Sequence, residues 1–311
     1  MTDTPQPAAP PPPDAVPSPG SAAPDPAPAA ATPPNAPTRW DGPVRRGAGD
    51  GIVRLAGRDL SVGYGPKDVI AGLDIRIPAG ELTVIVGPNA CGKSTLLRAL
   101  ARMLPARGGV VELDGQPIGR YGPKEVARRL GLLPQSPVAP DGIAVEDLVA
   151  RGRYPHQGLL RQWSDRDQAA VEAAMARAGV TELADSAVSE LSGGQRQRVW
   201  IALALAQETP ILLLDEPTTF LDIAHQVEVL NLARELQRAG QTVVVVLHEL
   251  ALAFRYATNL IVMRGGAIAA QGAVEDVVTA ELIAQVYGLP CQLITDPVSG
   301  RPLVAPLDGA A

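Results

Sequence analysis

Short aliphatic runs alternate with segments of helical period over most of the chain that follows Gly51. Residues 82–86, 211–214 and 242–247 have the length and the β-branched content of buried strands. Amphipathic patterns at about 93–103 and 227–238 have the spacing of helices that bury one face. Because strands and helices alternate, the pattern predicts an α/β fold with a largely parallel sheet.

Three other segments depart from this alternation. Residues 53–77 read as short strands separated by Gly and Pro turns, which predicts an antiparallel β portion before the parallel core. Residues 141–206 are mostly of helical pattern, and Ser164 to Asp167 resembles a capping box that starts a helix running to Ala178. Residues 291–306 predict one or two short strands around a Pro-Val-Ser-Gly turn.

The first fifty residues differ in composition from the rest. They are rich in Pro and Ala and hold about half of the 31 prolines, with Trp40 as their one large aromatic side chain. Such a segment buries too little apolar surface to offset the entropy of ordering, so we expect a disordered tail with polyproline character. A docking site for a proline-recognising partner is the alternative. The expected organisation is a tail at 1–50, a folded domain at 51–290 with a helical part at about 141–206, and an extension at 291–311.

Composition limits the classes of function. No stretch has the roughly 20 apolar residues needed to span a bilayer, and the tail lacks the basic start and apolar core of an export signal. Cys91 and Cys291 show no metal-ligand spacing, which fits a reducing compartment. The net charge of −6 argues against nucleic acid as the main ligand. We therefore expect a cytoplasmic protein whose membrane contact comes through a partner.

A phosphate-binding pattern, G-x-x-x-x-G-K-[ST], lies between the first predicted parallel strand and the helix after it. Glycines let backbone N–H groups turn toward phosphates, Lys93 would contact the terminal phosphates, and Ser94 would offer its hydroxyl to Mg²⁺. A structural glycine turn is the alternative, but it does not explain the strand and helix on either side. The predicted ligands are therefore ATP and Mg²⁺, and the predicted nucleotide-binding residues are Gly87, Pro88, Asn89, Ala90, Cys91, Gly92, Lys93, Ser94 and Thr95.

The apolar run 211–214 ends in an acidic pair. Asp215 would lie beside the Mg²⁺ shell, and Glu216 would face the γ-phosphate as general base or water-positioning group. Buried strands often end in an acid, so this pattern is weak alone. It becomes specific because it follows a phosphate loop.

The sequence Leu191-Ser192-Gly193-Gly194-Gln195 resembles the LSGGQ signature of the ABC ATPase family. The resemblance covers roughly residues 51–290 and implies an ATP-hydrolysing homodimer. It also implies that the Ser192–Gln195 segment binds the γ-phosphate of ATP held by the opposite subunit. The segment consists of Ser192, Gly193, Gly194 and Gln195. An ordinary helix cap at Ser192 is the alternative, and it leaves the spacing to Asp215 unexplained.

Four further positions match the family one at a time. Tyr64 stands where an aromatic ring stacks on adenine, although a Tyr in a Gly-rich turn is as readily a packing residue. The resemblance implies that Gln135 reaches Mg²⁺ and the attacking water, and that Asp222 belongs to the loop that crosses the dimer interface. His248 matches the histidine that contacts the γ-phosphate, whereas a lone His at a strand end is more often structural.

Three positions depart from the family pattern without removing a group that the chemistry needs. Ala90 stands where a further glycine is frequent, Glu249 where Asp is commoner, and Phe220 where a small residue is common. We expect nucleotide binding to survive the first two changes. Phe220 could alter communication between the two sites.

Several stretches resemble the ATPases of iron(III)-siderophore importers of the ferric dicitrate or enterobactin type, at 131–135, 145–156, 218–226, 286–289 and 296–300. The resemblance implies an importer ATPase at the cytoplasmic face of the membrane, with an integral-membrane permease as partner and an extracytoplasmic substrate-binding protein acting indirectly. A haem or cobalamin importer is the alternative. A soluble ABC protein acting on nucleic acid or ribosomes is disfavoured because the chain has one cassette, no heptads and no basic cluster. Residues 151–156 would line the groove for the permease's coupling helix, or simply form a solvated helix end.

Overall fold

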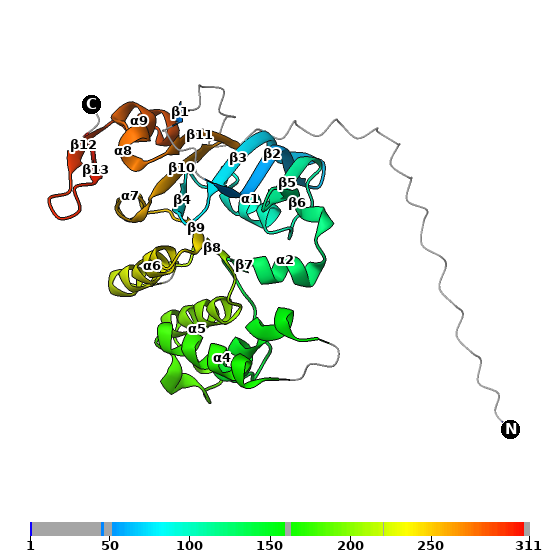
Figure 1. The fold of residues 1–311 in the computed structure, drawn as a ribbon. Helices are drawn as coiled ribbons and strands as arrows, with labels where there is room; N and C mark the ends of the chain where they lie inside the picture. Colours follow the sequence, from blue (N-terminus) through cyan, green and yellow to red (C-terminus); the bar gives the residue numbers. More distant parts are fainter. Residues whose placement is uncertain (2–44, 47–51, 159–162, 220, 308–311) are drawn as a thin grey trace. The chain divides into compact units, whose positions relative to one another are not determined.

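The computed structural model describes Met1 and residues 45–46, 52–158, 163–219 and 221–307. All its helices and strands belong to one unit, Pro37–Ala311, and Figure 1 shows their arrangement. The larger sheet has seven strands in the order β1 (Arg45–Arg46), β11 (Ala267–Gly272), β10 (Asn259–Arg264), β4 (Leu82–Val86), β9 (Thr242–Val246), β8 (Ile211–Asp215) and β7 (Leu130–Leu133). Arg45–Arg46 lies within the predicted tail, whose other residues apart from Met1 fall outside the described part of the chain.

Five neighbouring strands of this sheet, from β10 to β7, are mutually parallel. The strand β11 returns antiparallel to β10, and β1 pairs parallel with β11. Parallel neighbours need crossover connections, and the helices that follow β4, β8 and β9 provide them. The predicted α/β fold with a largely parallel sheet is confirmed.

A second sheet is antiparallel, in the order β3 (Lys67–Pro78), β2 (Val53–Tyr64), β5 (Gly108–Leu113) and β6 (Gln116–Pro117). The prediction of short strands separated by turns over 53–77 is wrong, because β2 and β3 each run for 12 residues. Gly57 and Gly63 lie within β2, where the pairing register with β3 shifts. Glycines inside a strand often mark such irregularities, so they read as turns in the sequence.

The helices cover both faces of the larger sheet. They are α1 (Lys93–Leu100), α2 (Pro123–Arg129), α3 (Val145–Ala150), α4 (Asp165–Arg177), α5 (Gly193–Ala206), α6 (Ile223–Arg238), α7 (Leu250–Tyr256), α8 (Val274–Val277) and α9 (Ala280–Tyr287). Short 3₁₀ turns lie at η1 (Ile118–Arg120), η2 (Arg151–His156), η3 (Thr181–Leu183) and η4 (Val188–Glu190). None of the helices in the described residues is long and apolar enough to cross a membrane.

Two helix ends differ from their predicted positions. The helix α1 ends at Leu100 rather than near 103, because Arg102 adopts a φ of 59° and the N–H of Met103 turns back to the carbonyl of Arg98. The helix α6 begins at Ile223, four residues before its predicted start. Its first turn buries no residue and so shows no apolar period, but the Asp222 carboxylate accepts a hydrogen bond from the N–H of His225 and caps it.

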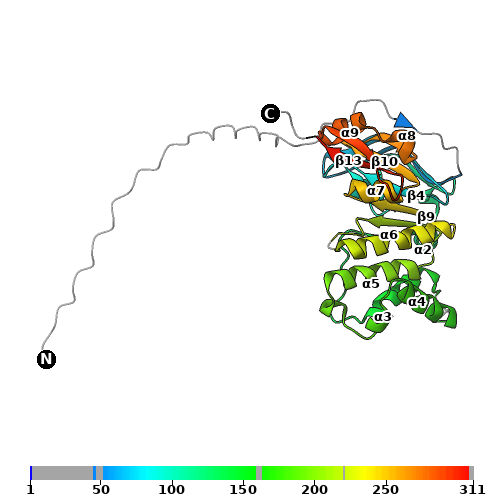
Figure 2. The ribbon, with the colours of Figure 1, turned by 90° about the vertical axis from the view of Figure 1, so that its left-hand side faces the viewer.

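The core is divided by the larger sheet into two apolar clusters. Alternate strand residues point to opposite faces, so Val84, Leu212 and Val245 join one cluster while Ile85 joins the other. The first cluster includes residues of α5, α6, α7 and α9, and the second packs α1 between the two sheets. In Figures 1 and 2, α3, α4 and α5 gather beyond α6, on the side away from the strands.

The helical segment and the C-terminal hairpin follow the sequence prediction closely. The capping box at Ser164 and Asp167 is present, and α4 runs to Arg177 with Ala178 as its C-cap. Near the C-terminal end of the described residues, β12 (Cys291–Thr295) and β13 (Pro302–Pro306) form an antiparallel hairpin. The strand β13 packs against α7.

Candidate functional site

The residues predicted to act on phosphate follow the carboxyl ends of adjacent parallel strands. Gly87 follows β4 and His248 comes shortly after β9. Asp215 ends β8, Glu216 follows it, and Gln135 comes shortly after β7. Since β4, β9, β8 and β7 are consecutive in the sheet, these residues share one edge of it. Ligands of open α/β sheets bind at this edge.

The phosphate loop has a backbone that needs glycine at two positions. Gly87 has a φ of 156°, and a Cβ there would lie 2.3 Å from the carbonyl oxygen of Met263. Gly92 has a φ of 105° and is the N-cap of α1. Ala90 has a φ of 59°, a left-handed conformation that costs a non-glycine residue roughly 1–2 kcal/mol. This explains physically why glycine suits position 90 and why alanine is still accommodated there.

Lys93 and Ser94 point back into this edge of the sheet. The Lys93 side chain is buried, and its Nζ donates to the carbonyl oxygens of Gly87, at 2.9 Å, and Pro88, at 3.1 Å. The Ser94 hydroxyl donates to Oδ1 of Asp215 at 2.8 Å. The structure therefore joins the phosphate loop to the end of β8, as the sequence predicted.

Asp215 is almost fully buried, with 1% of its surface exposed. Burial raises the pKa of its carboxyl, and the hydrogen bond from Ser94 opposes this. Its second oxygen, Oδ2, is buried without a hydrogen-bond partner in the described residues. A buried, unpaired carboxylate oxygen beside a hydroxyl is a donor set that suits a hard cation such as Mg²⁺.

Glu216 is held by two of the predicted residues. Its Oε1 contacts Nε2 of His248, and its Oε2 accepts a hydrogen bond from Nε2 of Gln135 at 2.5 Å. The Glu216 side chain is mostly buried and its φ is 53°. The structure thus brings Glu216, Gln135 and His248 together within hydrogen-bonding reach.

The Ser192–Gln195 segment starts α5 and forms a capping box. The Ser192 hydroxyl accepts from the N–H of Gln195 at 3.3 Å, and the Gln195 side chain accepts from the N–H of Ser192 at 3.0 Å. Among the described residues, no hydrogen bond joins this segment to the phosphate loop. Ser192 therefore caps a helix within its own chain, and the helix N-terminus that it begins remains a suitable anion site.

Tyr64 and Asp222 also have identifiable contacts. The Tyr64 ring is 47% exposed, and its hydroxyl accepts from Arg98 of α1 at 3.3 Å, so it lies beside the helix that the phosphate loop begins. The Asp222 carboxylate accepts from the N–H of His225, which lowers the pKa of Asp222, and it contacts the His225 ring. Phe220 lies outside the described residues.

Of the other phosphate-loop residues, some are buried and some are exposed. Cys91 and Thr95 are buried, and burial raises the pKa of the Cys91 thiol. Asn89 and Ala90 are exposed at the tip of the loop, and Pro88 is partly exposed.

Sequence reasoning missed two contacts of this site. The Thr219 hydroxyl lies 3.5 Å from Oε2 of Glu216, and Arg98 contacts Tyr64. The spacing of Thr219 from Glu216 was the available signal, since both belong to the turn that follows β8.

The prediction that residues 151–156 line a groove is wrong for Arg153. Its side chain is 1% exposed. It donates to Asp167 at 2.9 Å, to the carbonyl of Ala206 at 2.7 Å and to Glu208 at 2.8 Å. Tyr154 points outward and stays exposed. Arg153 therefore ties η2 to α4 and to the end of α5.

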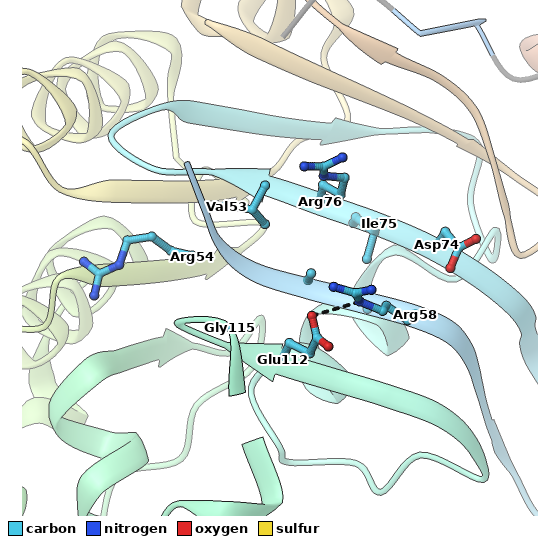
Figure 3. Close-up of a pocket in the computed structure, with 10 residues that line it drawn as sticks. Val53, Arg54, Arg58, Asp74, Ile75, Arg76, Glu112 and Gly115 are labelled. Atoms are coloured by element: carbon cyan, nitrogen blue, oxygen red, sulfur yellow. Dashed lines mark hydrogen bonds and ion pairs between the residues drawn. The ribbon is translucent and has the colours of Figure 1, made fainter. Parts of the chain in front are cut away.

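A cavity of about 390 Å³ lies away from this edge, on the antiparallel sheet. Figure 3 shows its charged lining, in which Arg58 pairs with Glu112. Arg54 pairs with Asp114, and Asp74 accepts from the N–H of Asp59. Because no phosphate-loop residue lines the cavity, it is not the nucleotide site.

Comparison with known proteins places the chain among transport proteins. Residues 70–219 match the family model described as "ABC transporter". The ferric enterobactin transport ATP-binding protein FepC of Escherichia coli (strain K12) is 55% identical over 263 residues, 84% of this chain and 97% of FepC. The achromobactin transport ATP-binding protein CbrD of Dickeya dadantii (strain 3937) is 48% identical, over 82% and 95% of the two chains. The hemin import ATP-binding protein HmuV of Streptomyces coelicolor is 46% identical, over 83% and 92%.

Two solved structures resemble the fold at lower identity. A transporter described as metal-chelate type, in an inward-facing conformation, has a TM-score of 0.70 and 28% identity, covering 83% of this chain and 98% of that one. A dimeric ATP-binding cassette in a post-hydrolysis state, bound to ADP and phosphate, has a TM-score of 0.63 and 26% identity, covering 70% and 98%.

Proposed function

The chain belongs to the ABC transporter ATP-binding family, and from that premise we propose that it powers the import of iron(III)–siderophore complexes. The hydrolytic part of this function rests on the carboxylate of Glu216, which Gln135 and His248 hold at the edge of the sheet beside the phosphate loop. The cargo rests on the 48–55% identity to ATP-binding proteins of siderophore transport systems.

The phosphate loop supplies the binding energy for ATP. The N–H groups of residues 89–95 and the N-terminus of α1 attract the phosphates, and the Lys93 ammonium balances their charge. Tyr64, beside α1, would stack on the adenine. Ser94 and Asp215 would hold Mg²⁺, with Gln135 reaching toward it. When bound, Mg²⁺ neutralises charge on the β- and γ-phosphates.

Glu216 would act on the attacking water. Its carboxylate takes the proton as the water oxygen approaches the γ-phosphorus. Gln135 and His248 fix the two carboxylate oxygens, so the base is oriented before the nucleophile arrives. His248 would also contact the γ-phosphate.

The assembly we propose is a head-to-tail homodimer with two ATP molecules at its interface. The Ser192–Gln195 segment, with the anion-attracting N-terminus of α5, would bind the γ-phosphate held by the partner, and Asp222 would lie near the crossing loop. The dimer would drive an integral-membrane permease from the cytoplasmic face, with a substrate-binding protein acting on the other side. Nucleic acid is no partner in this proposal.

The hydrolytic role is tested by steady-state ATPase assays on purified variants. Glu216→Gln should bind ATP and lose at least about a hundredfold in turnover, because an amide cannot accept the proton. Lys93→Ala should weaken nucleotide binding about tenfold or more, because it removes the buried ammonium. The matched control is Glu235→Gln on the exposed side of α6, which should leave turnover unchanged. Wild-type turnover by Glu216→Gln, free of contaminating ATPases, would contradict the assignment.

The cargo is tested by uptake of radio-iron siderophore in an iron-starved strain that lacks the gene. Complementation by wild type but not by Glu216→Gln would support siderophore import driven by hydrolysis. If uptake is unaffected by the deletion after redundant importers are removed, siderophore import is contradicted. Haem then becomes the leading cargo, since a hemin importer ATPase is 46% identical.

A further inference from the structure

A second charged cavity, here called the arginine pocket, lies at the ends of two helices far from the phosphate loop in sequence. Its volume is about 430 Å³. It lies between α6, α7 and the β12–β13 hairpin, and four arginines line it: Arg234 and Arg238 from α6, Arg255 from α7, and Arg301 from the hairpin. Ser299 of the hairpin turn adds a hydroxyl. None of the nucleotide-site residues lines this pocket.

The arginine pocket holds more positive charge than its surroundings neutralise. Within the described residues, Arg301 pairs with Glu275, but no carboxylate lies within ion-pair distance of Arg234, Arg238 or Arg255. The nearby carboxylate of Asp296 interacts electrostatically with Arg255, but its hydrogen bonds come from the Ser299 hydroxyl and the N–H of Val298.

Arg234 experiences the positive charge of its neighbours. Burial lowers the pKa of Arg234, and the charges of Arg238, Arg255 and Arg301 lower it further. The guanidinium nevertheless stays charged, because an arginine side chain is protonated at any ordinary pH. An anion in the pocket would relieve the mutual repulsion of these cations.

The Arg234 guanidinium is also fixed in place. It stacks over the Tyr256 ring with its central carbon 4.4 Å from the ring centre, and its Nη2 donates to the carbonyl of Arg255 at 2.6 Å. The Tyr256 hydroxyl in turn donates to Asn231 at 2.8 Å. A guanidinium held in this way loses little conformational freedom when it binds a planar carboxylate or a phosphate.

Helix dipoles alone do not account for the cluster. Arg238 and Arg255 lie in the last turns of α6 and α7, where a cation is favourable. Each helix end carries only about half a negative charge, so two ends leave most of the charge of three unpaired arginines uncompensated. In the cavity of Figure 3, by contrast, two of the three lining arginines, Arg54 and Arg58, are each paired with a carboxylate.

We propose that the arginine pocket binds a compact polyanion, either a polycarboxylate or a phosphorylated small molecule. Guanidinium groups bind both by paired N–H···O bonds. The ligand would bridge the C-terminal ends of α6 and α7 to the hairpin, which contributes Arg301. This site is separate from the proposed transport function and stands without it.

The test is isothermal titration calorimetry on the full chain in buffer freed of divalent cations on a chelating resin, with citrate in one arm and inorganic pyrophosphate in the other. The pocket variant is Arg238→Gln with Arg255→Gln, both exposed and outside the core. The control is Arg120→Gln with Arg177→Gln, which removes the same charge from η1 and α4. Pyrophosphate can also occupy the phosphate loop, but that contribution is the same in both double variants.

We expect at least one probe to bind the pocket variant about tenfold more weakly than wild type, with the control unchanged. Loss confined to citrate identifies a polycarboxylate site, and loss confined to pyrophosphate identifies a phosphate site. If neither probe binds wild type, or if both double variants lose affinity equally, the proposal is overturned.

A second measurement locates the ligand without substitution. Hydrogen exchange of the backbone N–H groups in β12 and β13 should slow when the bound probe ties the hairpin to the helices. Binding with unchanged exchange in the hairpin would place the anion elsewhere and overturn the proposal.

Discussion

Arg153 and Asp215 are both buried charged residues, and their surroundings satisfy them in different ways. Arg153 has carboxylate partners in Asp167 and Glu208 as well as a carbonyl partner. Asp215 has one oxygen bound by Ser94 and the other without a partner in the described residues. The fold itself supplies the partners of Arg153, whereas the free oxygen of Asp215 is available to a ligand.

Removing the main partner of Arg153 should destabilise the chain. We expect Asp167→Ala to lower the free energy of unfolding by about 3 kcal/mol, because it leaves a buried guanidinium with a half-exposed partner, Glu208. Denaturant titration measures the loss. The control is Asp165→Ala in the same helical turn, which is exposed and should cost less than about 1 kcal/mol. Equal losses for the two variants would contradict the burial argument.

The pair of Asp167 and Arg153 also makes the free energy of unfolding depend on pH. The Ser164 hydroxyl holds the pKa of Asp167 below its ordinary value of 3.8, and Arg153 adds to the effect. A lowered acid pKa stabilises the fold above the unfolded-state value and loses this contribution as the pH falls through the folded-state value. The difference in unfolding free energy between wild type and Asp167→Ala should therefore be constant from pH 7 to about 5 and shrink below pH 3.8. A difference that grows in acid would show that the charge of Asp167 is not its source.

At the scale of elements, close approach of backbones decides where η2 sits on α5. A Cβ at Gly152 would lie 2.4 Å from the carbonyl oxygen of Leu203 and 3.1 Å from Cβ of Ala206. We expect Gly152→Ala to destabilise the chain by about 1–3 kcal/mol, because η2 must move off α5. Thermal unfolding monitored by circular dichroism measures it. Gly119→Ala, which meets nothing within 4 Å, should be nearly neutral, and a similar loss there would contradict this account.

The sequence predicts elements well where apolar period and cap signals coincide. Strands β4, β8 and β9 and the capped helix α4 are found for this reason. Strand β7 is four residues long and offers no period to count. The site residues are predicted from motifs, but the contact of Glu216 with Gln135 depends on β7 lying beside β8, which no local pattern records.

For the whole molecule, the phosphate loop and the Ser192–Gln195 segment form no hydrogen bond with each other among the described residues. The dimer proposed above would bring the two together across its interface. The capping role of Ser192 complicates an ordinary test, because Ser192→Ala would also weaken α5. Asp caps a helix as well as Ser, but in the proposed dimer it would add a negative charge opposite a γ-phosphate.

We therefore expect Ser192→Asp, placed in the Glu216→Gln background, to abolish ATP-dependent dimers while changing the free energy of unfolding by less than about 0.5 kcal/mol. Light scattering after size exclusion measures the dimer. Ser192→Asn, which caps without charge, is the control and should still dimerise. If the Ser192→Asp variant still forms ATP-dependent dimers as stable as those of its parent, the Ser192–Gln195 segment is not part of the interface.

The position of β4 in the larger sheet also bears on how the protein is synthesised. The strand lies between β9 and β10, so Leu82 pairs with Val243 and Thr83 with Asn259, and Gly87 packs against the backbone of Met263. A ribosome makes these partners long after it makes the phosphate loop. In nascent chains that end before β9, the phosphate loop lacks the neighbouring strands β9 and β10, so we expect that ATP cannot assist early folding. We also expect the apolar faces of β4 to depend on chaperones until translation is nearly complete.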